Sequence, residues 1–135
     1  GAPPAIGQAI GRFGEAIGIA LQMLDDLGSV TSPARRDKGR EDLRNGRPTW
    51  PWAWLAEQGP FAWSRLAAME RAVAAGDGDL EALADALADT IGTIGRARVR
   101  AALDGALAEL AGAVGASPVI DGLAAELRRM EESYG

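Results

Sequence analysis

The chain of 135 residues contains no cysteine and no histidine. Without cysteine it can form neither a disulfide framework nor a thiolate metal site. Without histidine it lacks the commonest general base and the commonest protein ligand for transition metals. Any metal site must therefore be built from oxygen ligands, and such ligands favour Mg²⁺ or Ca²⁺.

An excess of positive charge and long apolar runs are also missing. The net charge of −5 does not favour a nucleic-acid binder. No run of 18 uncharged apolar residues occurs, so we expect no transmembrane helix. The opening residues GAPPAIG do not resemble a signal peptide and lack an initiator Met. We therefore expect a cytoplasmic protein, with further residues preceding Gly1.

The hydrophobic pattern present is helical. Apolar residues recur in steps of three and four between Ile6 and Leu24, which predicts a helix from about Pro4 to Val30. Ser32 and Pro33 should stop it. The next predicted helix runs from Trp52 or Pro60 to Ala75, with a possible break at Gly59. Asp79 is the expected N-cap of a helix from Leu80 through Ile94, which either continues with a bend at Gly92 or Gly95 or restarts before the apolar stripe of Leu103–Val114. A last helix is predicted from Ser117–Pro118 onward.

No segment shows the alternating pattern of a strand, so the fold class is predicted to be all-α. Residues 1–135 are long enough for one domain with its own core, or for half of a larger domain. The repeated glycines at 7, 11, 14 and 18 lie on one face of the first predicted helix. They indicate either close packing against another helix or room for a ligand, and the sequence leaves both open.

The same face ends in polar residues. Gln22, Asp25, Asp26 and Ser29 fall within about 100° of arc. Because buried carboxylates are costly unless something pairs with them, adjacent aspartates in an apolar helix require an explanation. We expect both carboxylates to face one solvent-reachable cleft, with Gln22 beside them.

A charged segment expected to be a loop follows these aspartates. Between Arg35 and Arg47 it carries six cations and only three acidic residues. Four tryptophans lie in or after this segment, at positions 50, 52, 54 and 63. They are predicted to anchor the next helix, because stacking on nucleic-acid bases conflicts with the net acidity. Farther along, Arg96 and Arg100 are expected to make surface or interhelical ion pairs.

Two carboxylates on adjacent helical residues can each give one oxygen to Mg²⁺, which takes substrate phosphates and water as its other ligands. A neighbouring basic segment would meet the remaining phosphate charge. Since histidine and cysteine are absent, the remaining chemistry is metal-assisted departure of diphosphate. The residues alone therefore predict a diphosphate site.

The segments FGEAIGIALQMLDDLGS and GREDLRNGRPTWP resemble the second half of the all-trans isoprenyl (polyprenyl) diphosphate synthases. That family has a glutamine followed by a DDxxD motif, which Gln22, Asp25 and Asp26 match. Its downstream segment reads approximately D-L-x-x-G-K-x-T-x-P. The residues that match it are Asp42, Leu43, Gly46, Arg47 in place of lysine, Thr49 and Pro51.

This resemblance implies an isoprenoid-synthase-type helical bundle and a prenyltransferase. Mg²⁺ would assist ionisation of an allylic diphosphate, and isopentenyl diphosphate would capture the cation with loss of a proton. The resemblance assigns metal binding to Asp25 and Asp26. The residues implied in diphosphate binding are Gln22, Lys38, Arg40, Asp42 and Arg47; no separate catalytic residue is assigned.

The chain departs from the family pattern in several places. Ser29 replaces the third aspartate and Leu21 the usual phenylalanine. Lys38 and Arg40 are only approximate counterparts of a family lysine. The first aspartate-rich motif and the isopentenyl diphosphate pocket would belong to an N-terminal half that is not in this chain. We therefore expect the chain alone to be inactive and to need that half or a second chain, in a homo- or hetero-oligomer.

Two other interpretations remain open. The chain could be a non-catalytic helical subunit that stabilises or modulates a complete prenyl synthase. It could also be a plain helical bundle with buried acidic residues.

Overall fold

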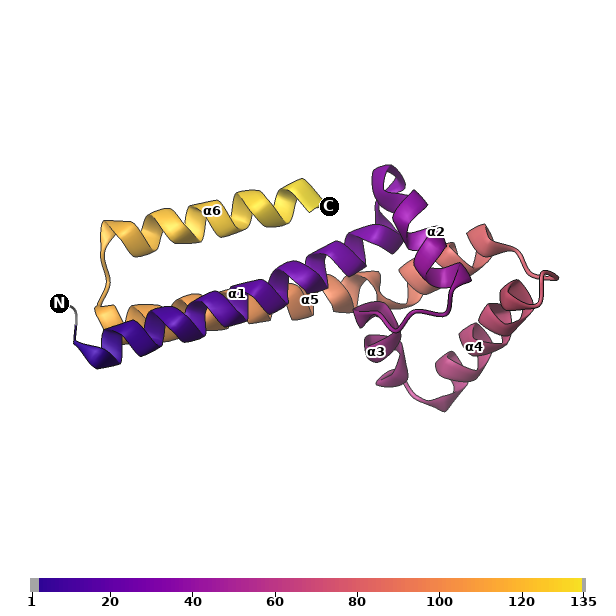
Figure 1. Cartoon of the computed structure of the whole chain (residues 1–135), viewed down its shortest axis with the longest axis horizontal. Helices are drawn as coiled ribbons and strands as arrows, with labels where there is room; N and C mark the ends of the chain where they lie inside the picture. Colours follow the sequence, from indigo (N-terminus) through magenta and orange to yellow (C-terminus); the bar gives the residue numbers. More distant parts are fainter. Residues whose placement is uncertain (1–2, 135) are drawn as a thin grey trace. The chain divides into compact units, whose positions relative to one another are not determined.

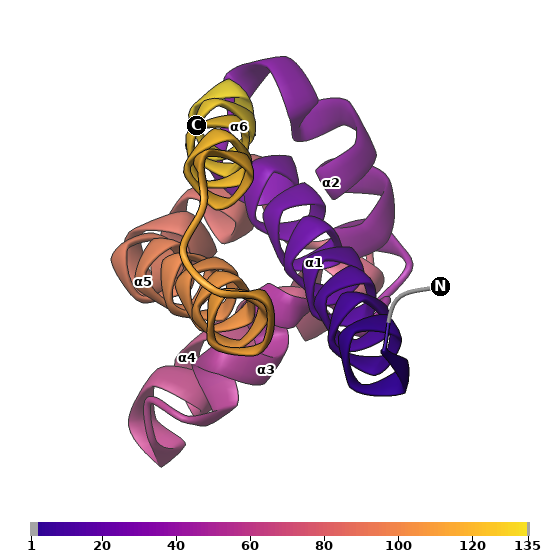
Figure 2. The ribbon, with the colours of Figure 1, turned by 90° about the vertical axis from the view of Figure 1, so that its left-hand side faces the viewer.

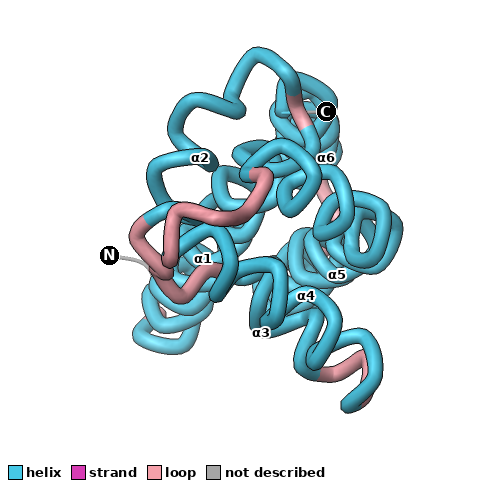
Figure 3. Tube along the Cα trace, turned by 90° about the vertical axis from the view of Figure 1, so that its right-hand side faces the viewer, coloured by secondary structure: helices cyan, strands magenta, loops and turns pink. Residues whose placement is uncertain are grey.

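The computed structural model describes residues 3–134 as helices joined by short connections, and no strand occurs in this range (Figures 1 and 3). The all-α prediction is confirmed. The elements in chain order are α1 (Pro4–Thr31), the 3₁₀ turn η1 (Pro33–Arg35), α2 (Arg36–Arg44), α3 (Trp50–Ala56), α4 (Pro60–Ala74), α5 (Leu80–Val114) and α6 (Pro118–Tyr134). No helix within the described residues combines the length and apolar character needed to cross a membrane.

Several predicted helix boundaries are confirmed. Helix α1 ends at Thr31, directly before the Ser32–Pro33 stop signal. The carboxylate of Asp79 accepts hydrogen bonds from the backbone N–H groups of Glu81 and Ala82, at 2.9 and 3.1 Å, and so caps the start of α5. The Ser117 hydroxyl accepts a bond from Ile120 N at 3.5 Å near the start of α6.

The expectation of a loop after Pro33 was wrong, because residues 36–44 form helix α2. Most residues of this segment are charged, so its short apolar face is not recognisable in the sequence. Gly39 and Leu43 are buried on that face. Arg36 and Arg40 pair with Glu81 of α5, at 3.5 and 2.5 Å. Tertiary contacts therefore stabilise a short helix that would be marginal alone.

The expected break at Gly59 is present between α3 and α4, where Gly59 adopts φ +97°. A residue with a Cβ rarely takes this conformation. Helix α5, in contrast, is one continuous helix through Gly92 and Gly95, where the sequence left a bend or a restart open.

The described chain divides into two compact units. We call residues 3–24 and 97–134 the terminal unit, and residues 25–96 the central unit. Helices α1 and α5 are each divided between the two units, after residues 24 and 96.

In the terminal unit, three helices share a small apolar core. Ala9 of α1, Leu110 of α5 and Ile120 of α6 are buried together, and Phe13 and Leu123 pack against them. Figure 2 shows these three helices nearly end-on.

Ion pairs link the same helices of the terminal unit. Arg12 pairs with Glu109 at 2.5 Å, which joins α1 to α5. Arg100 pairs with Glu131 of α6 at 2.8 Å, so the prediction of an interhelical ion pair at Arg100 is confirmed.

The glycine face of α1 is open in the terminal unit. A Cβ built on Gly7, Gly11, Gly14 or Gly18 finds no described atom within 4 Å outside the local helix. Ile10, on the same stretch of helix, is 55% exposed. Within the terminal unit, these glycines are therefore not used for close helix packing.

The central unit has a denser core. Trp54, Leu55, Leu66, Leu83 and Leu87 have 2% of their surface exposed or less. Ring stacking between Trp50 and Trp54, with centroids 6.0 Å apart, extends this core. The prediction that tryptophans anchor the helix after the charged segment is confirmed for Trp54.

Candidate diphosphate and metal site

Asp25 lies in the last two turns of α1, where two cations meet its carboxylate. The Nη1 group of Arg35 donates to Oδ1 at 3.3 Å, and the Nζ group of Lys38 donates to Oδ2. The Asp25 side chain is 39% exposed. Solvent therefore reaches this cluster, which combines one carboxylate with two cationic donors.

Asp26 has a different partner. Its Oδ2 accepts a hydrogen bond from the backbone N–H of Trp50 at 3.0 Å. Trp50 is the first residue of α3, and the side chain of the N-cap residue Thr49 makes no capping bond. The Asp26 carboxylate thus satisfies an N–H group at a helix start, where negative charge is favoured.

Burial raises the pKa of Asp26, and the hydrogen bond from Trp50 lowers it in part. The positive charge of Lys38 also lowers it, whereas the charges of Asp25 and Asp42 raise it. The pKa of Lys38 is raised, first by its hydrogen bond to Asp25 and further by the charges of Asp42 and Asp26. These mutual effects show that the four charged groups share one electrostatic neighbourhood.

Arg47 joins the edge of this neighbourhood. Its Nη1 donates to Asp42 at 3.1 Å, and Glu41 lies 3.7 Å from its Nη2. Five of the seven residues predicted for metal and diphosphate binding are therefore brought together by contact or by charge. They are Asp25, Asp26, Lys38, Asp42 and Arg47.

The other two predicted residues are placed differently. Arg40 donates to Glu81 at 2.5 Å and to Asp37 at 2.7 Å, so its guanidinium ties α2 to α5. This ion pair lowers the pKa of Glu81. Gln22 belongs to the terminal unit and its side chain is exposed on α1.

Ser29 occupies the position where the family motif has a third aspartate. It is only 5% exposed, and its hydroxyl donates to the backbone oxygen of Asp26 at 2.7 Å. Gly39 of α2 lies directly over it, because a Cβ at Gly39 would overlap the Ser29 backbone oxygen. The close approach of α2 therefore closes this position to a solvent-facing carboxylate.

Sequence reasoning missed two donors. Arg35 was counted in the charged segment but was not assigned to the aspartates, although it is the first cation after the helix stop at Pro33. The backbone N–H of Trp50 has no signature in side-chain chemistry. Its one signal is Pro51, which is typical of a helix start and therefore of N–H groups without intrahelical partners.

The donor set fits Mg²⁺ that is shared with substrate phosphates. Asp25 and Asp26 are adjacent, Asp25 is solvent-accessible, and the bond from Trp50 uses one of the two oxygens of Asp26. Mg²⁺ is commonly held by one or two carboxylates plus phosphates and water. In the range 3–134, no group of three or more acidic side chains is arranged to hold a metal without such a substrate.

Comparisons of this chain with known proteins gave no match. No protein-family profile, no curated protein and no solved structure was found to be similar to it.

Proposed function

We propose that this chain is the C-terminal portion of a polyprenyl diphosphate synthase-like prenyltransferase, and that its central unit binds the diphosphate of an allylic substrate. The observation that carries the proposal is the Asp25 cluster. A carboxylate beside a second carboxylate meets the cations of Arg35 and Lys38 at an exposed helix end. Metal-bridged diphosphates require this combination of acidic and basic side chains.

Each side chain has a defined part in this proposal. Asp25 and Asp26 would hold Mg²⁺, which when bound neutralises charge on the departing diphosphate. Lys38 and Arg35 now neutralise Asp25, and they would turn their N–H donors to phosphate oxygens when substrate arrives. Arg47, paired with Asp42 at 3.1 Å, would supply a further donor at the edge of the site.

Titration calorimetry with a non-hydrolysable allylic thiolodiphosphate tests the proposal. Weak binding that requires Mg²⁺ is expected, because the other half of the family site is not in this chain. Asp25→Asn and Lys38→Gln should each weaken it at least about tenfold, since hydrogen bonds to charged groups contribute about 1.5–3 kcal/mol.

Arg12→Gln is the matched control, because it breaks an exposed ion pair in the terminal unit instead. Absence of Mg²⁺-dependent binding up to millimolar ligand would refute the proposal, as would equal losses in the control. The chain alone should also not transfer prenyl groups to isopentenyl diphosphate. Measurable elongation by the pure chain would show that no second half is needed.

A second function is favoured by a different observation, the open glycine face of α1 with the exposed Ile10 beside it. On this alternative the chain is a non-catalytic helical subunit that stabilises or modulates a complete prenyl synthase. Asp25 and Asp26 would then only join α1 to α2 and α3. This alternative would be favoured if the unaltered chain bound a complete prenyl synthase but did not bind diphosphate.

Sedimentation velocity at micromolar concentration tests whether the glycine face needs a partner. Self-association is expected, and the contact should bury at least about 1,000 Å² because smaller contacts are typical of crystal packing. Gly14→Glu places a charged side chain on the open face and should abolish the association. A clean monomer that binds no hydrophobic dye would contradict a half-domain with an uncovered surface.

A further inference from the structure

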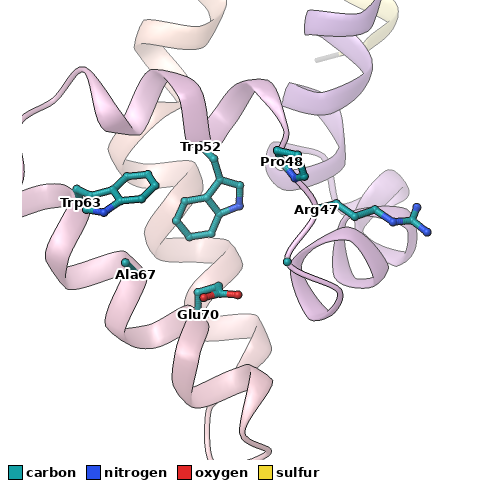
Figure 4. A pocket seen from close by; sticks show the side chains of 7 residues that line it. Arg47, Pro48, Trp52, Trp63, Ala67 and Glu70 are labelled. Carbon is teal, nitrogen blue, oxygen red and sulfur yellow. The ribbon is translucent and has the colours of Figure 1, made fainter.

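The central unit contains a second site, formed by tryptophans that the diphosphate proposal does not use. A cavity of about 260 Å³ lies between the 46–48 connection, α3 and α4. Its walls include Pro48, Trp52, Trp63 and Ala67, and the Glu70 side chain is part of its lining (Figure 4).

The two indole rings meet nearly at a right angle. The centroids of Trp52 and Trp63 are 5.9 Å apart and the ring planes are inclined by 75°. Trp63 keeps 42% of its surface exposed, although it is a large apolar side chain. The face of an indole ring attracts a cation, and tryptophan does so best among the aromatic side chains.

The charge in this cavity is negative. Glu70 is half-buried, and no Lys or Arg of the described residues forms an ion pair with its carboxylate. Arg47 is the one cation in the lining, but its guanidinium extends away from the cavity and pairs with Asp42 (Figure 4). A ligand in the cavity would therefore meet an anionic carboxylate beside aromatic walls.

The backbone leaves room for this carboxylate. Gly46 adopts φ +58°, and a Cβ built on it would lie 3.3 Å from Oε1 of Glu70. A larger residue at position 46 would be strained in its backbone and would press against the carboxylate.

We propose that this cavity binds a small free organic ammonium ion. Its positive group would contact the indole rings of Trp52 and Trp63 and the carboxylate of Glu70, and its apolar part would lie against Pro48 and Ala67. Both the aromatic rings and the carboxylate favour positive charge, whereas a neutral ligand would gain only apolar contact. The cavity shares only Arg47 with the residues of the diphosphate proposal, and the Arg47 guanidinium pairs with Asp42 outside the cavity.

Choline is a suitable probe, and 3,3-dimethyl-1-butanol is its neutral carbon isostere. Binding is followed by the indole N–H resonances of Trp52 and Trp63 in ¹⁵N-labelled protein. Choline should shift both resonances saturably. The isostere should bind several-fold more weakly, because cation–π contacts of about 0.5–2 kcal/mol correspond to about 2- to 30-fold in affinity.

Variants separate charge from shape. Trp63→Leu should weaken choline binding about 2- to 30-fold, because it removes a cation–π contact. Glu70→Gln should also weaken it, because it removes the negative charge beside the rings. Glu15→Gln, which removes one negative charge from the terminal unit, should leave it unchanged. Binding of the isostere as tight as that of choline, no effect of Glu70→Gln, or no saturable choline binding would each overturn the proposal. Tighter binding of a trimethyllysine peptide than of choline would also overturn it, because the ligand would then belong to another protein.

Discussion

Glycines inside helices have opposite surroundings in the two units. In the terminal unit, Gly7, Gly11, Gly14 and Gly18 of α1 have no described neighbour within 4 Å of an added Cβ. In the central unit, Gly95 lies against the buried Trp54 and Leu27, where a Cβ would come within 2.8 Å of both side chains. Gly39 lies against the backbone of Ser29 in the same unit.

The difference shows what each region still lacks. Glycine in a helix interior costs about 1 kcal/mol relative to alanine, so it requires a compensating contact. The central unit supplies that contact within the chain and so completes the packing around the aspartates. The terminal unit supplies no such contact to these four glycines, so on the function proposed above another polypeptide would cover their face.

The largest effect is expected for Ser29→Asp, which introduces an aspartate where the polyprenyl synthase motif has one, in the tightly packed region. The new carboxylate would be buried beneath α2, and burying an unpaired polar group costs about 2 kcal/mol or more. Chemical denaturation should show this loss, without tighter Mg²⁺ binding. A stable variant with improved Mg²⁺ binding would show that α2 moves aside easily.

The next effect concerns the buried glycines themselves. Gly39→Ala and Gly95→Ala should each destabilise the chain by about 1–3 kcal/mol, because overpacking outweighs the gain in helix propensity. Thermal unfolding at fixed protein concentration measures both. Unchanged stability of Gly39→Ala would contradict the close approach of α2 to α1, and unchanged stability of Gly95→Ala would contradict the packing of α5 against Trp54 and Leu27.

Two substitutions of Asp26 distinguish its structural role as an acceptor from its proposed role as a metal ligand. Asp26→Ala should cost about 1–2 kcal/mol, since it leaves the Trp50 N–H without its acceptor. Asp26→Asn keeps an acceptor and removes a partly buried charge, so it should be more stable than wild type at pH 7, while it should bind Mg²⁺–diphosphate at least about tenfold more weakly.

The pH dependence follows from the raised pKa of Asp26. The stability associated with its protonated form is complete below the unfolded value of 3.8 and is lost as the pH rises through the folded pKa. The advantage of Asp26→Asn over wild type should therefore disappear below about pH 3.8 in melting experiments. An advantage that persists in acid would point to a cause other than charge.

The smallest effect is expected on the open face. Gly11→Ala and Gly14→Ala should each stabilise the chain by about 0.5–1 kcal/mol, because a Cβ there meets only solvent and alanine favours the helix. Urea denaturation under conditions where the chain is monomeric is the appropriate measurement. Destabilisation by either change would reveal packing on this face and would contradict the difference between the glycines of the two units.

Local signals were enough to predict much of the fold. The Ser32–Pro33 stop, the Asp79 cap and the Gly59 break are each encoded within a few residues, and all three are observed. Helix α2 could not be predicted, because its stability depends on Glu81 and Asp85, more than forty residues away.

The candidate site was only partly visible in the sequence. The Asp25–Lys38 contact follows from opposite charges close in sequence. The ion pair of Arg40 could not be predicted in this way, because its partner Glu81 lies on a helix that is distant in sequence. The role of Asp26 at the start of α3 depends on a backbone N–H, which side-chain identity does not reveal.

Amide NMR spectra titrated with Mg²⁺ and diphosphate together test the central claim most directly, because they report on the aspartate cluster and on the glycine face in one experiment. We expect saturable shifts for Asp25, Asp26, Lys38 and Trp50, no shifts for residues 7–18, and no shifts at any residue with either ligand alone. Spectra in which the amides of Asp25, Asp26 and Trp50 do not move when both ligands are present would contradict it.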